Sequence, residues 1–99
     1  VTDAVPNTLC DGLRTGLGDK TFAIIRENVD GIALASEENI IRAMRTTWEL
    51  LKIIVETSCC PPLGVILEGN MDGHAVKGKK VGIILTGGNV DLDKLPWQS

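Results

Sequence analysis

The sequence predicts an α/β fold, in which helices cover both faces of a parallel sheet. The run from Val81 to Leu85 is short, branched and apolar on both faces, which is typical of a strand buried on two sides. A second short apolar run covers residues 32–35, and three other segments carry helical signals. The order helix, strand, helix, helix, strand favours parallel strands joined by helical crossovers, and so a three-layer arrangement.

Composition argues against several classes of protein. The 99 residues make at most one small domain, and 43% of them are apolar. The net charge is −3 and no basic stripe is present, so nucleic acid is not an expected partner. No apolar run reaches transmembrane length and no secretory signal opens the chain, so no membrane partner is expected either.

The three cysteines do not indicate a disulfide framework, because their number is odd and Cys59 and Cys60 are adjacent. Free thiols are typical of a reducing compartment, so we expect a cytoplasmic protein. Cys10, the adjacent pair and the single histidine, His74, lack the spacing of zinc ligands, so no metal site is expected.

The N-terminal half predicts a loop followed by two helices. Residues 1–18 contain three glycines and a proline, which interrupt any long element. Asp19 is expected to cap a helix over residues 20–29. Its apolar side chains form one stripe, at Phe22, Ile25 and Val29.

The second helix is expected to begin after a cap at Ser36 and to run to about Val55. Its apolar residues recur at steps of three and four, which predicts a broad face in the core. That face comprises Ile41, Met44, Trp48, Leu51 and Val55, widened by Ile40, Ala43, Thr47, Leu50 and Ile54.

A third helix is expected to start near Ser58, because Pro61 and Pro62 are tolerated only in a first helical turn. A polar connection over residues 70–80 leads to the last strand, which ends at Thr86 and two glycines. Ligands of open α/β sheets bind at such carboxyl ends, where glycines let the backbone approach a ligand and a hydroxyl can hydrogen-bond to it. A plain glycine turn explains the same spacing.

The segment Ile84-Leu85-Thr86-Gly87-Gly88-Asn89-Val90-Asp91 resembles the (Ser/Thr)-Gly-Gly-Asn-Val-Asp signature of the serine/threonine dehydratase and serine racemase family. These are fold-type II pyridoxal-phosphate (PLP) enzymes. The resemblance covers nearly the whole chain. Residues 8–13 are similar to the family's Thr-Ile-Ala-Asp-Gly-(Leu/Val), and Trp48-Glu49 followed by Lys52 match within the second helix.

The chain departs from the family between residues 56 and 60. The family reads Glu-Pro-(Ser/Thr)-(Gly/Ala) here, which Glu56 and Ser58 match, whereas Thr57 replaces the proline. Cys59 and Cys60 replace small residues, and sulfur needs more room in a packed interior. We therefore expect an altered geometry on this side of the cofactor.

The resemblance implies specific roles for seven residues. Four of them would contact PLP: Thr86, Gly87, Gly12 and Glu56. Thr86 would hydrogen-bond the pyridine nitrogen, and Thr15 would contact the substrate carboxylate. In the racemase branch, Lys52 and Asn89 would belong to a nucleotide site. For Glu56 two interpretations stay open, a buried carboxylate beside the ring or an exposed helix-end carboxylate.

The resemblance also implies that residues 1–99 are a C-terminal part of the large domain, without a second domain. The Schiff-base lysine and the phosphate-binding loop would then lie upstream, so no catalytic residue is assigned. None of the six lysines has the expected Ser-x-x-x-Lys-x-Arg-Gly setting; they are Lys20, Lys52, Lys77, Lys79, Lys80 and Lys94.

Two hypotheses about function follow. In the first, the chain is the C-terminal segment of a PLP-dependent L-serine/L-threonine ammonia-lyase or serine racemase. Such a segment would serve a small hydroxy amino acid substrate, need the rest of the enzyme, and be inactive alone. In the second, it is a non-catalytic, self-associating α/β module. The sequence does not separate dehydratase from racemase.

Overall fold

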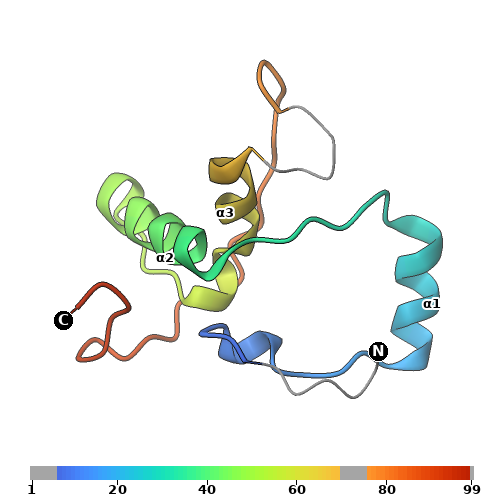
Figure 1. Ribbon diagram of the computed structural model, residues 1–99, viewed down its shortest axis with the longest axis horizontal. Helices are drawn as coiled ribbons and strands as arrows, with labels where there is room; N and C mark the ends of the chain where they lie inside the picture. The colour runs from blue at the N-terminus through green and yellow to red at the C-terminus, as the bar shows by residue number, and fades with distance from the viewer. Residues whose placement is uncertain (1–6, 70–75, 99) are drawn as a thin grey trace.

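The structure, a computed structural model, describes residues 7–69 and 76–98. A short 3-10 turn, η1 (Asp11–Leu13), precedes the first helix, α1 (Asp19–Asn28). The second helix, α2 (Glu37–Thr46), continues into the π-helical turn η2 (Thr47–Leu51). A second 3-10 turn, η3 (Thr57–Cys59), leads into α3 (Pro61–Glu68) (Figure 1). His74 lies outside the described residues.

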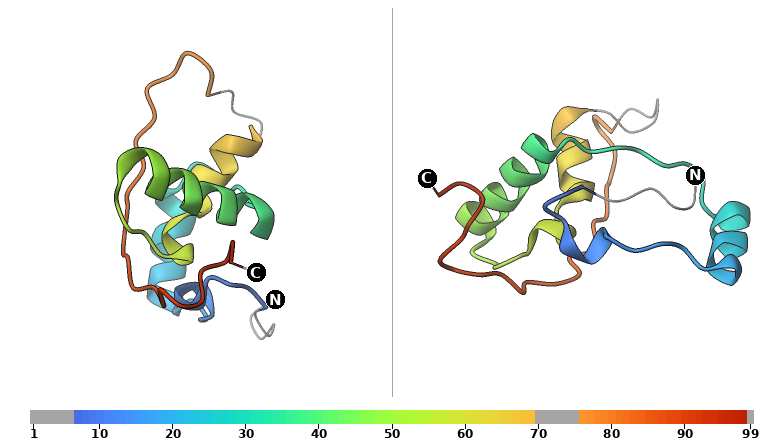
Figure 2. Two further views of the ribbon diagram at one scale, coloured as in Figure 1. Left: turned by 90° about the vertical axis from the view of Figure 1, so that its left-hand side faces the viewer. Right: turned by 60° about the horizontal axis from the view of Figure 1, so that its bottom comes forward.

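Helix α1 forms where predicted but packs against none of the other helices in the described part of the chain. Gly18 is its N-cap and Asp19 its first residue, so the predicted cap is wrong by one position. The apolar stripe stays largely in solvent, with Phe22 52% and Val29 49% exposed. Extended segments on either side hold α1 away from α2 and α3 (Figures 1 and 2).

Helix α2 begins as predicted, because the Ser36 hydroxyl accepts a hydrogen bond from the Asn39 backbone N–H at 3.2 Å. It ends earlier than predicted. After η2 the backbone turns at Lys52, which has a left-handed conformation with φ 60°. Val55 is therefore reached through a turn, and the expected core residues Leu50, Leu51 and Ile54 are exposed.

Helix α3 carries Pro61 and Pro62 in its first turn, as predicted, but starts after η3 rather than at Ser58. Gly69 ends it with φ 73°, a left-handed cap that favours glycine. Glu68, in the last turn, accepts hydrogen bonds from the Ser36 backbone N–H at 2.8 Å and from the Asn39 amide at 2.9 Å. These contacts join the end of α3 to the start of α2.

The predicted strands are not formed within residues 7–69 and 76–98, so the expected parallel sheet and its three layers are absent there. Residues 32–35 and 81–85 lie outside the helices, without the backbone ladder that defines a strand. Their side chains are largely in solvent, with Leu34 78% and Ile84 80% exposed. An apolar groove of about 260 Å³ separates Ala33 from residues 81–83 beside the first turns of α3.

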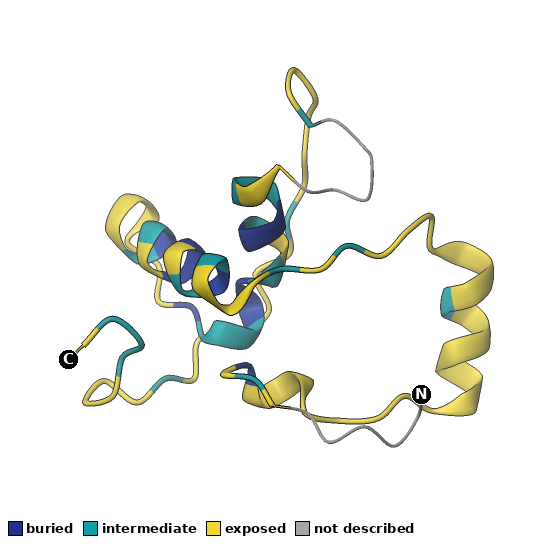
Figure 3. Cartoon of the chain, viewed as in Figure 1, coloured by how far each residue is buried: buried dark blue, intermediate teal, exposed yellow. Residues whose placement is uncertain are grey.

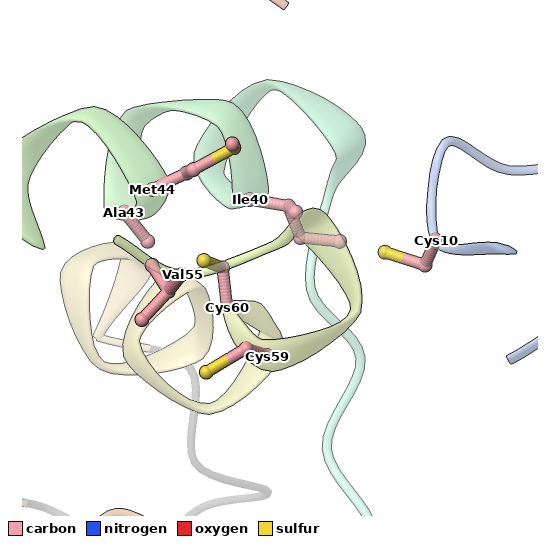
Figure 4. Packing of buried hydrophobic residues seen from close by; sticks show 7 residues of the cluster. All are labelled: Cys10, Ile40, Ala43, Met44, Val55, Cys59 and Cys60. Carbon is pink, nitrogen blue, oxygen red and sulfur yellow. The ribbon is translucent and has the colours of Figure 1, made fainter. Parts of the chain in front are cut away.

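The core is small and lies between α2, η3 and the segment before η1 (Figures 3 and 4). Its buried members are Cys10, Ile40, Ala43, Met44, Val55, Cys59 and Cys60. It combines aliphatic side chains with three thiols. Trp48 and Trp97 meet edge to face at its margin, with ring centroids 5.3 Å apart. No helix in the described part is long and apolar enough to cross a membrane.

Candidate functional site

Two glycine turns from opposite ends of the chain meet at one short segment, residues 54–58. The backbone N–H of Glu56 donates a hydrogen bond to the Gly87 carbonyl at 3.0 Å. The backbone N–H of Gly12 donates to the Ser58 hydroxyl at 2.9 Å. Three of the four predicted cofactor-binding residues are thereby held in one neighbourhood, since Gly12 is tied to Ser58 and Gly87 to Glu56.

Glu56 lies against the Gly87 backbone. A Cβ at position 87 would stand 2.3 Å from Glu56 Oε1, and a Cβ at position 88 would stand 2.5 Å from the Ile54 carbonyl oxygen. Close approach of backbone therefore requires glycine at position 88, whereas a Cβ at position 87 would only make the Glu56 side chain move. Glu56 caps η3 and is half-buried, so it combines features of both interpretations left open by the sequence.

The predicted residue Thr86 adjoins Gly87 and has an exposed side chain, so its hydroxyl is accessible. Thr15 is also exposed and does not line either pocket described here. Lys52 is exposed and donates through Nζ to the Glu49 carbonyl at the end of η2. Asn89 lines an open pocket beside Glu56, and Lys52 does not line this pocket. A nucleotide contact shared by Lys52 and Asn89 therefore stays a prediction.

That pocket is open, has a volume of about 240 Å³, and lies beside Glu56. Its walls combine apolar side chains with three carboxylates and two cations. The lining residues are Leu9, Asp11, Arg14, Met44, Glu56, Thr57, Asn89, Val90, Asp91, Lys94, Leu95 and Pro96. Arg14 is held at its rim by an ion pair with Asp11 at 3.3 Å and by donation from Nε to the Thr8 carbonyl at 2.9 Å.

The thiols belong to the core and not to the site chemistry. Burial raises the pKa of Cys60 to about 12, and the neighbouring Cys59, Cys10 and Glu56 contribute to the rise. Burial likewise raises the pKa of Cys10. Both side chains therefore keep their protons and donate, Cys60 Sγ to the Glu56 carbonyl at 3.2 Å and Cys10 Sγ to the Thr57 carbonyl at 3.4 Å. Neutral buried thiols are poor nucleophiles and metal ligands.

All six lysines are exposed, whereas a lysine that reacts as an amine needs burial or a cationic neighbour to lower its pKa. Across residues 7–69 and 76–98, no group of three or more His, Cys, Asp or Glu side chains is placed to hold a metal ion.

The four predicted cofactor-binding residues present backbone, hydroxyl and carboxylate groups. Gly87 and Gly12 bring bare backbone to the surface, Thr86 offers a hydroxyl, and Glu56 offers a carboxylate behind the Gly87 backbone. Sequence reasoning gave no site role to Thr57 and matched Ser58 only by type, although their hydroxyls make the contacts to the Gly12 turn. The one available signal was a hydroxyl residue at position 57, where the family has proline.

Comparisons with known proteins give a consistent result. A family model described as "Pyridoxal-phosphate dependent enzyme" matches residues 1–87. A beta-hydroxyaspartate dehydratase of Paracoccus denitrificans is 44% identical over 97 residues, which cover 98% of this chain and 30% of the relative. A serine racemase of Dictyostelium discoideum is 47% identical over 95 residues, 95% of this chain and 29% of the relative.

The structural comparison agrees. The crystal structure of a T.th. threonine deaminase superposes with a TM-score of 0.79 at 38% sequence identity, covering 91% of this chain and 32% of that one. The chain therefore spans about 30% of the length of the curated relatives it matches.

Proposed function

The chain belongs to the pyridoxal-phosphate-dependent enzyme family, and from this membership we propose that residues 1–99 are the C-terminal segment of an enzyme acting on a small hydroxy amino acid. The family match over residues 1–87 confirms the family that the sequence resembles, and pyridoxal phosphate is the cofactor of this family. The proposed activity is that of an L-serine/L-threonine ammonia-lyase or a serine racemase. Residues 1–99 would form one part of the large domain.

One observation carries this proposal: the turns at Gly12 and Gly87 are both hydrogen-bonded to residues 56–58. The proposal assigns Thr86, Gly87, Gly12 and Glu56 to the cofactor side of the site. Thr15, on the same N-terminal segment as Gly12, would face the substrate carboxylate. When bound, the cofactor supplies an electron sink for removal of the Cα proton.

The role proposed for Thr86 is to donate a hydrogen bond from its hydroxyl to the pyridine nitrogen, which leaves no proton fixed there. A hydroxyl is neutral, whereas a carboxylate at contact distance favours the protonated, cationic ring. A neutral hydroxyl at this position would thus leave the bound cofactor a weaker electron sink than a carboxylate would. That suits β-elimination, in which the departing hydroxyl group carries the electrons away.

The test replaces Thr86 in the complete enzyme. Thr86→Asp is expected to slow keto-acid formation relative to deuterium exchange at Cα, because the negative charge holds a proton on the ring nitrogen. Thr86→Ser keeps the hydroxyl and is expected to keep the ratio of the two rates. If the ratio and the absorption spectrum are the same in the aspartate variant and the parent, Thr86 does not contact the ring.

The remaining part of the enzyme is the partner required by this proposal, because all six lysines here are exposed and lie outside the expected setting. A second candidate function is a self-associating, non-catalytic module. It is favoured by the exposed apolar side chains of Ile32, Leu34, Leu50 and Ile84. Uptake of PLP separates the two. A visible absorption band that borohydride fixes to a lysine of the complete protein supports the enzyme, and its absence supports the module.

A further inference from the structure

We propose that Thr57 is a positioning residue, which fastens the turn around Gly12 to the segment that carries Glu56. Two contacts make this fastening, called here the Thr57 latch. The Thr57 hydroxyl donates to the Leu9 carbonyl at 2.8 Å, and Cys10 Sγ donates to the Thr57 carbonyl at 3.4 Å. The inference rests on the proposed function, because it concerns how Gly12 and Glu56 are held for the same cofactor.

The latch lies between the two anchored glycine turns. On one side of Thr57, Glu56 is bonded through its N–H to Gly87, and on the other side Ser58 accepts from Gly12. Thr57 thus contacts the Leu9–Cys10 peptide while its two neighbours contact the glycines. The three hydrogen bonds that Thr57 and Ser58 make with Leu9, Cys10 and Gly12 join residues that are 46 to 48 positions apart in the chain. These bonds therefore fix the relative position of two distant segments.

The Thr57 hydroxyl is not used as a helix cap. A capping hydroxyl accepts a hydrogen bond from a backbone N–H of its own turn. Here the hydroxyl donates outward to Leu9, and η3 has no side-chain capping bond. The hydroxyl therefore serves the contact between segments.

Cys10 supplies the apolar half of the latch. Its side chain is 1% exposed and packs in the core cluster with Ile40 and Met44 (Figure 4). The thiol anchors the turn by burial, which is not directional. A hydrogen bond has a preferred direction, so the hydroxyl at position 57 orients the turn that burial holds in place.

The experiment compares Thr57→Val, which keeps the branched shape and removes the hydroxyl, with Thr57→Ser, which keeps the hydroxyl. Both are made in the complete enzyme. Hydrogen exchange of the Gly12 amide reports opening of the turn, and exchange of the Met44 amide in α2 reports unfolding of the helix. Loss of one ordinary hydrogen bond is expected to raise the Gly12 rate about fivefold in the valine variant and to leave the Met44 rate unchanged.

The functional readout is equilibrium affinity for PLP, measured by absorbance. We expect Thr57→Val to weaken it about fivefold, and Thr57→Ser to restore both the affinity and the Gly12 exchange rate. Unchanged Gly12 exchange in the valine variant overturns the latch, whatever happens to PLP. Equal acceleration at Gly12 and Met44 means that Thr57 acts on global stability, which also overturns it.

Two further results separate this inference from the proposed function. If Gly12 exchange accelerates while PLP affinity stays constant in every variant, the contact is purely structural and Thr57 positions nothing for the cofactor. If the unsubstituted complete protein takes up no PLP, the proposed function fails, and the positioning role falls with it. The exchange data then still establish whether the contact to Leu9 holds the turn.

Discussion

Gly88→Ala should destabilise the protein, whereas the adjacent Gly87→Ala should not. A Cβ at position 88 would lie 2.5 Å from the Ile54 carbonyl oxygen, which belongs to the backbone. A Cβ at position 87 would lie 2.3 Å from Glu56 Oε1, which is the end of a flexible side chain. The shorter contact therefore costs less free energy to relieve, since the Glu56 side chain can rotate away whereas the backbone of residue 54 cannot.

The expected magnitudes follow from the atoms that must move. Forcing a methyl group against backbone costs about 1–3 kcal/mol, while replacing glycine by alanine gains about 0.4–1 kcal/mol through the unfolded state. Gly88→Ala should thus lower the free energy of unfolding by about 1–2 kcal/mol. For Gly87→Ala, the gain and the cost of moving Glu56 offset each other, so the change should stay within about 0.5 kcal/mol.

The assay is urea unfolding of the 99-residue chain, followed by fluorescence of Trp48 and Trp97 at one low protein concentration. With a slope of about 1–3 kcal/mol per molar urea, Gly88→Ala should lower the midpoint by roughly 1 M. Gly16→Ala is the control, because a Cβ there meets no atom within 4 Å. Equal losses of unfolding free energy in Gly87→Ala and Gly88→Ala, or an unchanged midpoint for Gly88→Ala, would refute the reasoning about Ile54.

Three other outcomes are expected. The isolated chain should turn over neither L-serine nor L-threonine, because its lysines are all exposed; turnover by homogeneous protein would contradict this. It should sediment as more than a monomer, since Leu34 and Ile84 are 78% and 80% exposed; a compact monomer at high concentration would count against it. Hydrogen bonds from the Ser36 hydroxyl and backbone N–H, and from the Asn39 amide, lower the pKa of Glu68. The stability that Glu68 adds is therefore present above pH 4.5, the pKa of the unfolded chain, and is lost as the pH falls through the lowered pKa of the folded protein. The Glu68→Gln variant should unfold more easily than the parent at pH 7, and the two proteins should be equally stable in strong acid.

Helix starts could be predicted from sequence because their causes are local. The Ser36 hydroxyl reaches a backbone N–H three residues away, and Pro61 and Pro62 fit only a first helical turn. Helix ends were less predictable. The apolar period continued to Val55, but the chain leaves the helix at Lys52 and Val55 enters the core from a turn. Periodicity thus predicted the burial of Val55 but not the turn that carries it, and it was wrong for Leu50, Leu51 and Ile54, which are exposed.

The strands could not be established from residues 32–35 and 81–85 alone. Their apolar composition indicates burial on both faces, and burial requires neighbouring strands that supply backbone partners. In the described part of the chain these partners are missing, so the same residues lie exposed on either side of an apolar groove. The apolar pattern therefore describes a buried environment between neighbouring strands. A chain that spans about 30% of a relative's length does not provide those strands.

The departures from the family between residues 56 and 60 have a consistent physical explanation. Cys59 and Cys60 are buried in the core cluster, where they are 2% and 3% exposed, and the altered geometry expected on the proposed cofactor side stays a prediction. Glu56 and Ser58, which match the family, hold the two glycine turns. Thr57 stands between Glu56 and Ser58. A proline at position 57 could not donate to Leu9, so the chain has replaced a rigid backbone by a hydrogen bond between segments. Such an exchange is invisible in the sequence, because its partner lies 48 positions away.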